Sequence, residues 1–303
     1  MSPQRRAELI LLSITVIWGS TFVVTKSILG ESSPLFYSGS RFVFSTIILF
    51  LAAPKTCLKT TGTALRHGSV LGSLLYIGFV LQTIGINYTT ASKAAFFTGM
   101  LVPLTPIVQY VGQHLFGLRK RPLKVGNILG VVCAAGGLYL LTSPSGSGFN
   151  IGDALNLICA LFFAIFIVYL DIIPAGTDKV QLTFVQFLFC GVVGLLVAIV
   201  AEDIRISYSR EFIEGLLYLV IFATVITMWA QNRFQGDTTP TRAAVIFAME
   251  PVCAAIFAYF FRGEVIGTLG MVGGAVIVGG LVLSEFSDEI PVLKVNLTSD
   301  SVK

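Results

Sequence analysis

The chain has 303 residues, of which 55% are hydrophobic and only 12% are charged, and its formal net charge is +4. Soluble globular proteins carry about 25% charged residues. No soluble core could bury so large an apolar share, so the composition excludes a soluble enzyme. It predicts a protein that uses the lipid bilayer as its solvent.

Ten apolar segments follow one another along the chain, each close to the roughly 20 residues that a membrane-spanning helix needs. Short loops join them, and no stretch remains for a soluble catalytic domain. The expected fold is an all-α polytopic membrane protein with ten transmembrane helices. These helices are predicted near residues 7–28, 34–53, 68–88, 92–116, 125–142, 152–173, 180–201, 212–235, 241–261 and 266–285.

The same helical hairpin occurs twice in the sequence. The run TTASKAA at residues 89–95 reads against TTPTRAA at residues 238–244, a shift of 149 that also pairs Gln82 with Gln231. An odd number of spans in each copy turns the second copy upside down relative to the first. Further coincidences keep the same order: Glu8 with Asp153, Phe42 with Phe187, Gly130 with Gly273, Gly137 with Gly280, and Pro103 with Pro251.

The repeat divides the chain into three parts. Residues 1–142 form the first five-helix repeat, residues 143–286 form the second, inverted repeat, and residues 287–303 form a polar cytoplasmic tail. The Gly/Ser-rich link at residues 142–150 marks the boundary. It is too short to separate independent domains, so both halves are expected to pack into one bundle.

The basic residues of the first half indicate the orientation. They gather in segments that an even-odd count of helices places on one side, and the positive-inside rule makes that side cytoplasmic. Ten spans return the C-terminus to the same side, so the prediction is a multi-pass protein of the cytoplasmic (inner) membrane with both termini inside. The residues concerned are Arg5, Arg6, Lys55, Lys59, Arg66, Arg119, Lys120, Arg121 and Lys124.

The chemistry of soluble enzymes is missing from the sequence. His67 and His114 lie near different helix ends without the spacing of metal ligands, and no GxxxxGK[ST] loop is present for nucleotide phosphates. We expect no metal, no cofactor, no nucleic-acid partner and no ATP hydrolysis. The five cysteines are interpreted as small buried residues and not as a disulfide framework.

Polar residues within apolar helices are the proper place to look for function, because each is costly in hydrocarbon and normally faces protein or a water-filled cavity. Glu250 lies about eight residues into the ninth helix, just before Pro251, which removes a backbone hydrogen bond and loosens the helix there. We expect Glu250 to face the central pathway, where it binds an amine or changes protonation. The alternative is a carboxyl group held by a neighbouring helix.

Each of the other polar candidates has alternative interpretations. Arg41, about seven residues into the second helix, either reaches the outer interface with its long stem or binds a carboxylate or serves as a gate. Gln82 and Gln231 either line a site around the pseudo-twofold axis or bond neighbouring helices. Lys93 and Arg242 begin helices 4 and 9 on opposite sides of the membrane, as interface anchors or as matched gate charges.

Aromatic residues supply further candidates. Tyr76 and Phe79 share one helical face with Gln82, and Trp18 in the first helix aligns with Phe163 in the sixth. Such spacing is typical of a packed core as well as of a substrate box. The expected cavity residues are Trp18, Thr21, Gln82, Gln231 and Glu250, with Arg41 on the outer side and Tyr76, Phe79 and Phe163 as aromatic contributors.

These residues resemble the EamA-type branch of the drug/metabolite transporter superfamily over roughly residues 7–286. The resemblance rests on WGSTF at 18–22, RF at 41–42, TAS at 90–92, Pro103, EPV at 250–252, GE at 263–264 and the Gly-rich tenth helix. It implies an inverted-repeat fold with a central cavity lined mainly by helices 1, 3, 4, 6, 8 and 9. The sequence departs from the family pattern at one place: the first-half counterpart of GE at 263–264 is replaced by LRKR at 118–121.

The resemblance also implies export of small metabolites, such as amino acids, or of toxic compounds from a bacterial-type cell. The sequence therefore predicts a secondary transporter of neutral or zwitterionic solutes that works by alternating access, with a proton as a candidate coupling ion. One alternative, an exchanger of phosphorylated or nucleotide-linked metabolites, would need several deep basic residues. A non-transporting membrane sensor predicts no solute flux, and an intramembrane enzyme would need a clustered acid/base or metal site.

Overall fold

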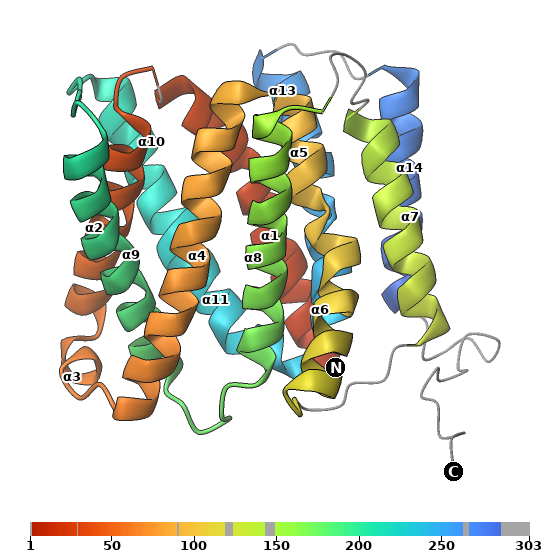
Figure 1. The fold of residues 1–303 in the computed structure, drawn as a ribbon, viewed down its shortest axis with the longest axis horizontal. Helices are drawn as coiled ribbons and strands as arrows, with labels where there is room; N and C mark the ends of the chain where they lie inside the picture. The colour runs from red at the N-terminus through yellow and green to blue at the C-terminus, as the bar shows by residue number, and fades with distance from the viewer. Residues whose placement is uncertain are drawn as a thin grey trace.

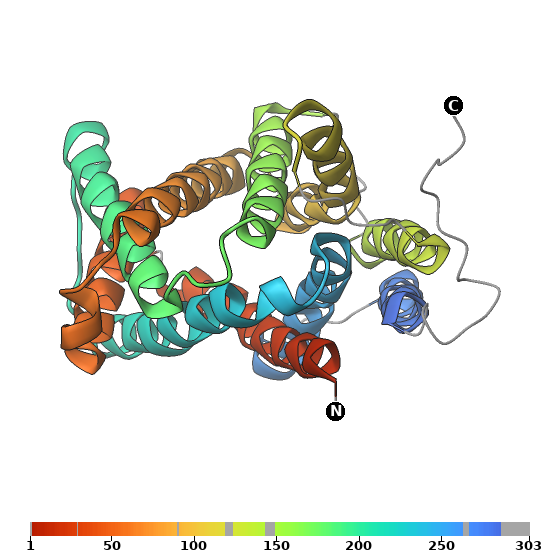
Figure 2. The ribbon, with the colours of Figure 1, turned by 90° about the horizontal axis from the view of Figure 1, so that it is seen from below.

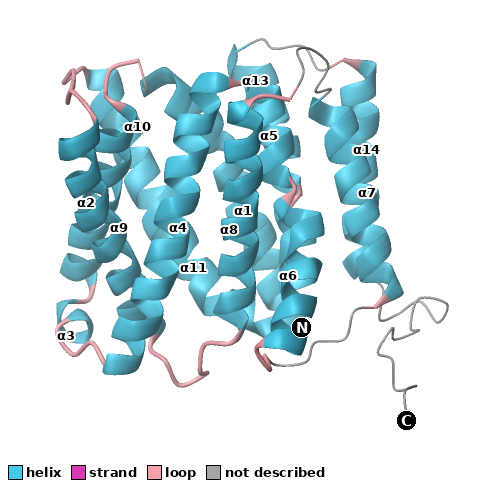
Figure 3. Cartoon of the chain, viewed as in Figure 1, coloured by secondary structure: helices cyan, strands magenta, loops and turns pink. Residues whose placement is uncertain are grey.

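The computed structural model describes residues 2–28, 30–89, 91–118, 124–142, 149–262 and 267–285. Within these ranges the chain is helical without a strand, and Ser32 and Ile206 form an isolated antiparallel bridge (Figure 3). The predicted polar tail at 287–303, most of the link between the halves, and residues 119–121 and 263–264 lie outside the described residues.

The helices follow one another in the order shown in Figure 1. They are α1 (Pro3–Ile28), α2 (Pro34–Ala52), α3 (Pro54–Cys57), α4 (Gly62–Tyr88), α5 (Ala91–Gly99), α6 (Leu101–Leu115), α7 (Val125–Thr142), α8 (Ile151–Asp171), α9 (Lys179–Ala201), α10 (Arg210–Val220), the π-helix η1 (Ile221–Ile226), α11 (Thr227–Phe234), the 3-10 turn η2 (Gln235–Asp237), α12 (Pro240–Phe247), α13 (Met249–Arg262) and α14 (Thr268–Glu285).

Six helical runs among the described residues are long and apolar enough to cross a membrane, and two shorter apolar helices accompany them. This confirms the expectation of an all-α polytopic membrane protein. The count of ten spans stays a prediction. The six runs are Pro34–Ala52, Gly62–Ile86, Ile151–Asp171, Lys179–Ala201, Arg210–Asp237 and Pro240–Phe261, and the shorter helices are Val125–Leu141 and Thr268–Ser284.

Several helices begin where side chains satisfy the free backbone N–H groups of the first turn. Asn150 and Asp153 form a reciprocal capping box at the start of α8, and the side chain of Thr239 accepts from the backbone of Arg242 at the start of α12. At α2 the carboxylate of Glu202, at the end of α9, accepts from the backbone of Leu35 at 3.0 Å. These polar ends fix where the apolar segments enter and leave the bundle.

Two apolar segments that the sequence predicts as continuous helices are interrupted. The first breaks at Met100 between α5 and α6, and the second breaks at Ala248 between α12 and α13. Pro103 and Pro251 each stand three residues beyond a break. A proline lacks an N–H donor and its ring crowds the carbonyl four residues earlier, which explains both interruptions. The loosening expected before Pro251 is therefore present.

The helices pack side by side as one bundle, and most of them run roughly along one common direction (Figure 1). α4 packs against α8 and α9, α2 packs against α9, and α1 packs against α13. α7 and α14 form a pair at one side of the bundle, as the view from below shows (Figure 2). Segments from the two halves of the sequence therefore interleave and do not form separate lobes.

Four glycines bring α7 and α14 into close antiparallel contact. A methyl group at Gly130 would lie 2.9 Å from the carbonyl oxygen of Gly280, and one at Gly280 would lie 3.0 Å from that of Gly130. Gly137 and Gly273 repeat this reciprocal relation farther along, with a methyl group at Gly137 lying 2.6 Å from the Gly273 oxygen. Only glycine permits such close approach of two backbones.

The largest apolar core lies among α1, α2, α4, α8, α9 and α12. Its fully buried members include Leu11, Phe42, Leu71 and Phe187. All five cysteines are unbridged, and four of them are buried. Their interpretation as small buried residues holds for these four, whereas Cys133 is half-buried.

Candidate functional site

Arg41 is buried deep in α2 and turned toward the next layer of helices. It lies seven residues after Pro34, which is about 10 Å along the helix at 1.5 Å per residue. Its Nε donates to the Thr224 hydroxyl at 2.6 Å, and its Nη2 donates to the Ala223 carbonyl at 3.1 Å. The side chain is 7% exposed. The guanidinium therefore contacts η1 and does not extend to the outer interface.

The π-helix η1 presents polar backbone groups that an α-helix would keep to itself. Its wider turns allow the Thr224 hydroxyl to donate to the Leu219 carbonyl, five residues earlier, at 2.8 Å. The Ala223 carbonyl accepts from Arg41 and also from the Trp18 indole N–H at 3.3 Å. Single π turns inside α-helices recur at functional sites, and here one collects side chains from α1 and α2.

Trp18 of α1 makes further contacts beside η1, and Thr21 lies three residues farther along the same helix. The Trp18 indole N–H donates to the Thr227 hydroxyl at 2.9 Å, and its ring meets Phe247 edge-on at 5.4 Å between centroids. The Thr21 hydroxyl donates to the Trp18 carbonyl at 2.7 Å in its own helix. Both side chains are half-buried. Trp18 thus joins α1 to η1, α11 and α12.

An aromatic chain continues from Arg41 into the centre of the bundle. The Arg41 guanidinium carbon lies 5.7 Å from the centre of the Phe79 ring. Phe79 meets Phe163 edge-on at 5.9 Å, and Phe163 packs over Gly78, where no side chain intervenes. Four of the predicted residues, Trp18, Arg41, Phe79 and Phe163, therefore belong to one connected cluster.

Tyr76 and Gln82 do not take part in the ring contacts and hydrogen bonds described above for that cluster. Tyr76 is buried against Gly194 of α9, and its hydroxyl has no hydrogen-bond partner among the described residues. Gln82 is half-buried farther along α4. Tyr76 and Phe79 therefore pack in the same apolar core, whereas Gln82 lies farther along α4.

Gln231 lies on α11, where it takes part in a buried relay of amides. It donates to Gln235 at 2.8 Å, and Gln235 donates to the Ile167 carbonyl of α8 at 2.8 Å. The next residue, Asn232, donates to Gln186 of α9 at 2.8 Å. In this conformation Gln231 bonds locally and is linked to α8 through Gln235.

Glu250 lies directly after the helix break at Ala248. It is half-buried, and no described residue forms a hydrogen bond or an ion pair with its carboxylate. Its backbone oxygen lies 3.0 Å from where a methyl group at Gly19 would be, next to Trp18. An acidic side chain of this kind within a membrane helix marks a candidate ligand or proton site.

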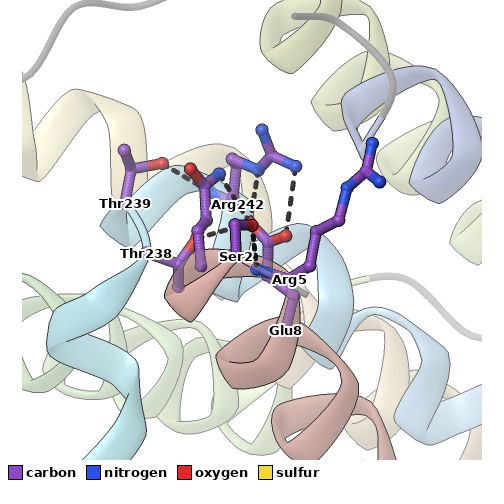
Figure 4. A network of polar contacts seen from close by, with 7 residues as sticks. Ser2, Arg5, Glu8, Thr238, Thr239 and Arg242 are labelled. Atoms are coloured by element: carbon purple, nitrogen blue, oxygen red, sulfur yellow. Dashed lines mark hydrogen bonds and ion pairs between the residues drawn. The ribbon is translucent and has the colours of Figure 1, made fainter.

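A second polar cluster closes the end of the bundle that holds the N-terminus. The Arg242 guanidinium meets the Glu8 carboxylate at 2.7 Å, and the Thr238 hydroxyl donates to the same carboxylate at 2.7 Å (Figure 4). Glu8 is 4% exposed and Arg242 is 5% exposed. This buried ion pair ties the start of α1 to the start of α12.

The opposite end of the bundle holds a related contact at the start of α8. The Thr89 hydroxyl donates to the Asp153 carboxylate, which also accepts from the Asn150 backbone at 3.0 Å. Asp153 is fully buried. The side chain of Lys93 lies outside the described residues. α4 therefore ends on the first turn of α8 much as the segment before α12 ends on the first turns of α1.

A separate cavity of about 300 Å³ lies between α2 and α10. Tyr37 and Phe44 line it from α2, and Phe212 and Leu216 line it from α10. None of the nine predicted site residues lines this cavity. Its walls are mainly apolar and carry hydroxyl groups at Tyr37, Ser40 and Tyr208 but no charged side chain, so the Arg41 cluster is the stronger candidate.

The sequence reasoning missed the partners of both clusters. Glu8 and Asp153 entered it only as aligned positions, and Thr224 and Thr238 carried no assigned role. A buried acidic residue in the first turns of an apolar helix, repeated in both halves, was the available signal. The sequence IFATVI at 221–226 gives no indication of a π turn.

A model of the EamA-like transporter family matches residues 5–143 and again residues 150–286. The chain belongs to this family. An uncharacterized transporter of Archaeoglobus fulgidus is 31% identical over 278 residues, covering 91% of this chain and 85% of its own length. The uncharacterized inner membrane transporter YedA of Escherichia coli K12 is 25% identical, with 90% and 88% covered.

A solved crystal structure shares the fold, with a TM-score of 0.77 at 16% sequence identity, covering 92% of this chain and 96% of that chain. Family membership and the apolar helices make the protein a multi-pass membrane transporter whose surroundings are the lipid bilayer. The resemblance drawn from the sequence is thereby confirmed.

Proposed function

We propose that the protein is a secondary transporter of small neutral or zwitterionic metabolites, such as amino acids, and that it works by alternating access. Ten spans in two inverted five-helix repeats form its scaffold. The carrying observation is the pair of carboxylate contacts at the two ends of the bundle. Glu8 accepts from Thr238, and Asp153 accepts from Thr89.

These two contacts occupy equivalent positions in the proposed repeats. The shifts that align the halves pair Glu8 with Asp153, Thr238 with Thr89, and Arg242 with Lys93. A contact that recurs in both copies and lies at opposite ends is what an inverted repeat requires of two gates. Opening one end breaks the Glu8–Arg242 ion pair, and opening the other separates Asp153 from Thr89.

The packing of the helices supports the same symmetry. The Gly130–Gly280 contact maps onto the Gly273–Gly137 contact when the halves are exchanged. Trp18 meets Thr227, and the equivalent Phe163 meets the equivalent Gly78. The family model, which matches each half separately, supports the same division.

The middle of the bundle supplies the features of a solute site. Trp18, Phe79 and Phe163 offer apolar surface, while Arg41 and Glu250 offer charges of opposite sign. Among the described residues, Arg41 and Arg242 are the buried cations, and Arg242 is already paired with Glu8. A phosphorylated cargo would call for more than the one remaining cation.

Glu250 is proposed to bind the amino group of the solute or to carry the coupling proton. It follows the break at Ala248, where the interrupted helix exposes backbone groups to the pathway. Export from the cytoplasm is the direction that the family resemblance favours, and the distribution of basic residues favours both termini inside.

A flux screen in proteoliposomes tests this function. Purified protein is reconstituted, loaded in turn with each of the twenty L-amino acids and the related amines, and assayed with and without a pH gradient. The proposal predicts saturable efflux of at least one of these solutes, reduced by Glu250→Gln and unchanged by Glu214→Gln, a substitution at an exposed position. Efflux no faster than from protein-free vesicles for every solute would contradict it.

A further inference from the structure

Arg41 carries a buried positive charge that the described protein does not neutralise. No acidic side chain among the described residues forms an ion pair with it. Burying an unpaired charge is costly, and a single ring beneath the guanidinium offsets only a small part of that cost. Such a cost within a membrane helix points to a ligand that completes the pairing.

The hydrogen bonds of Arg41 leave one edge of its guanidinium available. Of its five N–H groups, the one on Nε is held by Thr224 and one on Nη2 is held by Ala223. The remaining groups, both on Nη1 and one on Nη2, have no partner among the described residues. They form the edge that binds a carboxylate through two parallel hydrogen bonds.

Comparison of the proposed repeats separates this charge from the requirements of the fold. The shift of 145 places Gln186 at the position equivalent to Arg41, and the shift of 149 places Met228 at that of Phe79. Gln186 contacts Met228 at 3.9 Å, just as Arg41 lies over Phe79. A neutral amide therefore serves the packing at this position, so the charge of Arg41 has another purpose.

The charged residues thus fall into two groups. Those at the ends of the bundle, Glu8 and Arg242, have like-charged equivalents in Asp153 and Lys93, as symmetric gates require. Arg41 has the neutral equivalent Gln186, and Glu250, which precedes Pro251, has the neutral equivalent Val102, which precedes Pro103. A solute with one negative and one positive group is itself asymmetric and needs a site of this kind.

We propose that Arg41, held in place by Ala223 and Thr224 of η1, forms the subsite for the carboxylate group of the transported solute. Phe79 and Trp18 flank it, and their rings contact the apolar part of the solute. The side chain is 7% exposed in this conformation, so the subsite opens during the transport cycle. This inference rests on the proposed function, because it assigns one contact in the same solute site.

The test compares solutes with and without a carboxylate. The L-amino acid with the fastest efflux in the screen is used as the labelled solute, and its unlabelled form and its decarboxylated amine are used as competitors. Arg41→Gln and Arg41→Lys are compared with Arg210→Gln, which removes an exposed charge at the start of α10. Thermal unfolding in detergent establishes that each variant is folded.

Removing one partner of a desolvated charge pair typically weakens binding by about 30-fold or more. The proposal predicts that Arg41→Gln raises the half-saturating concentration of the amino acid by at least about 30-fold and leaves inhibition by the amine within about twofold. Arg41→Lys, which keeps the charge but loses the planar fork, falls between the two. Arg210→Gln matches the natural chain.

Two outcomes would overturn the inference. In the first, Arg41→Gln leaves the amino acid concentration dependence unchanged, while transport itself persists and the proposed function stands. In the second, both Arg41 variants weaken the amino acid and the amine equally, which indicates loss of the site's shape. If Arg41→Gln does not fold, Arg41→Lys decides: an unchanged preference for the amino acid over the amine overturns the inference. Absence of efflux for every amino acid would contradict the proposed function as well.

Discussion

Glu8→Gln is the sharpest perturbation of the contact that closes the N-terminal end of the bundle. The amide keeps the shape of the side chain but removes the charge opposite the Arg242 guanidinium, 2.7 Å away. Breaking a buried pair by removing one partner costs about 3–5 kcal/mol. The exposed pair Arg210–Glu214, with side chains 90% and 62% exposed, supplies the matched control Glu214→Gln, because such surface pairs contribute about 0–1 kcal/mol.

The energy lost at Glu8 should appear as opening of the N-terminal end. At about 1.4 kcal/mol per tenfold, 3–5 kcal/mol shifts the ratio of open to closed forms toward open by about two to four orders of magnitude. Thr241, 1% exposed beside Arg242, reports this change as a Thr241→Cys variant labelled by a membrane-impermeant maleimide. Background labelling at Cys57 is slow, because burial raises the pKa of its thiol and leaves little thiolate.

The expected result is fast labelling of Thr241→Cys in the Glu8→Gln background and slow labelling in the Glu214→Gln background. Glu8→Gln combined with Arg242→Gln should label more slowly than Glu8→Gln alone if the uncompensated guanidinium drives the opening. Equal labelling rates in the Glu8→Gln and Glu214→Gln backgrounds would refute the reasoning. So would a lowered unfolding temperature without any change in accessibility.

Further predictions follow from individual contacts. Gly137→Ala places a methyl group 2.6 Å from the Gly273 carbonyl oxygen and should destabilise the α7–α14 pair by about 1–3 kcal/mol, whereas Gly136→Ala meets nothing within 4 Å and should leave the unfolding temperature unchanged. Asp153→Asn should increase maleimide labelling of a cysteine placed at the end of the bundle opposite to the one that Glu8→Gln opens. Increased labelling at the same end as Glu8→Gln would count against paired gates. Glu250→Gln should abolish the effect of a pH gradient on efflux if Glu250 carries the coupling proton, and an unchanged pH dependence would exclude that role. Trp18→Phe removes the hydrogen bonds to Thr227 and Ala223 and should weaken solute affinity while preserving the fold, as measured by efflux kinetics and thermal unfolding.

The sequence predicts much of the helical framework, because hydrocarbon tolerates only backbones that satisfy their own hydrogen bonds. Apolar runs of membrane length and proline positions are visible in the residues themselves, and the break before Pro251 was expected for that reason. The break at Met100 follows from the same physics but was not predicted. The sequence pairs Gly130 with Gly273 and Gly137 with Gly280 as repeat positions, but the contact of α7 with α14 at these glycines was not predicted.

The candidate site was harder to predict, because its contacts join helices that are far apart in the sequence. Arg41 could be singled out as a charge in an apolar helix, but its partner Thr224 lies 183 residues away. The π turn that turns Thr224 and the Ala223 carbonyl toward it has no marker in local composition. Glu8 is an acidic residue near a helix start, and the sequence does not indicate that Arg242 lies beside it in the fold.

The sidedness of two single-cysteine variants, Ser92→Cys and Thr241→Cys, tests the central claim most directly. These positions are equivalent under the shift of 149 that aligns the two hairpins. Labelling with an impermeant maleimide in right-side-out and inverted vesicles should modify one variant from the outside and the other from the inside. Modification of both from the same side would show that the halves are not inverted, and the account of two gates around one solute site would then be wrong.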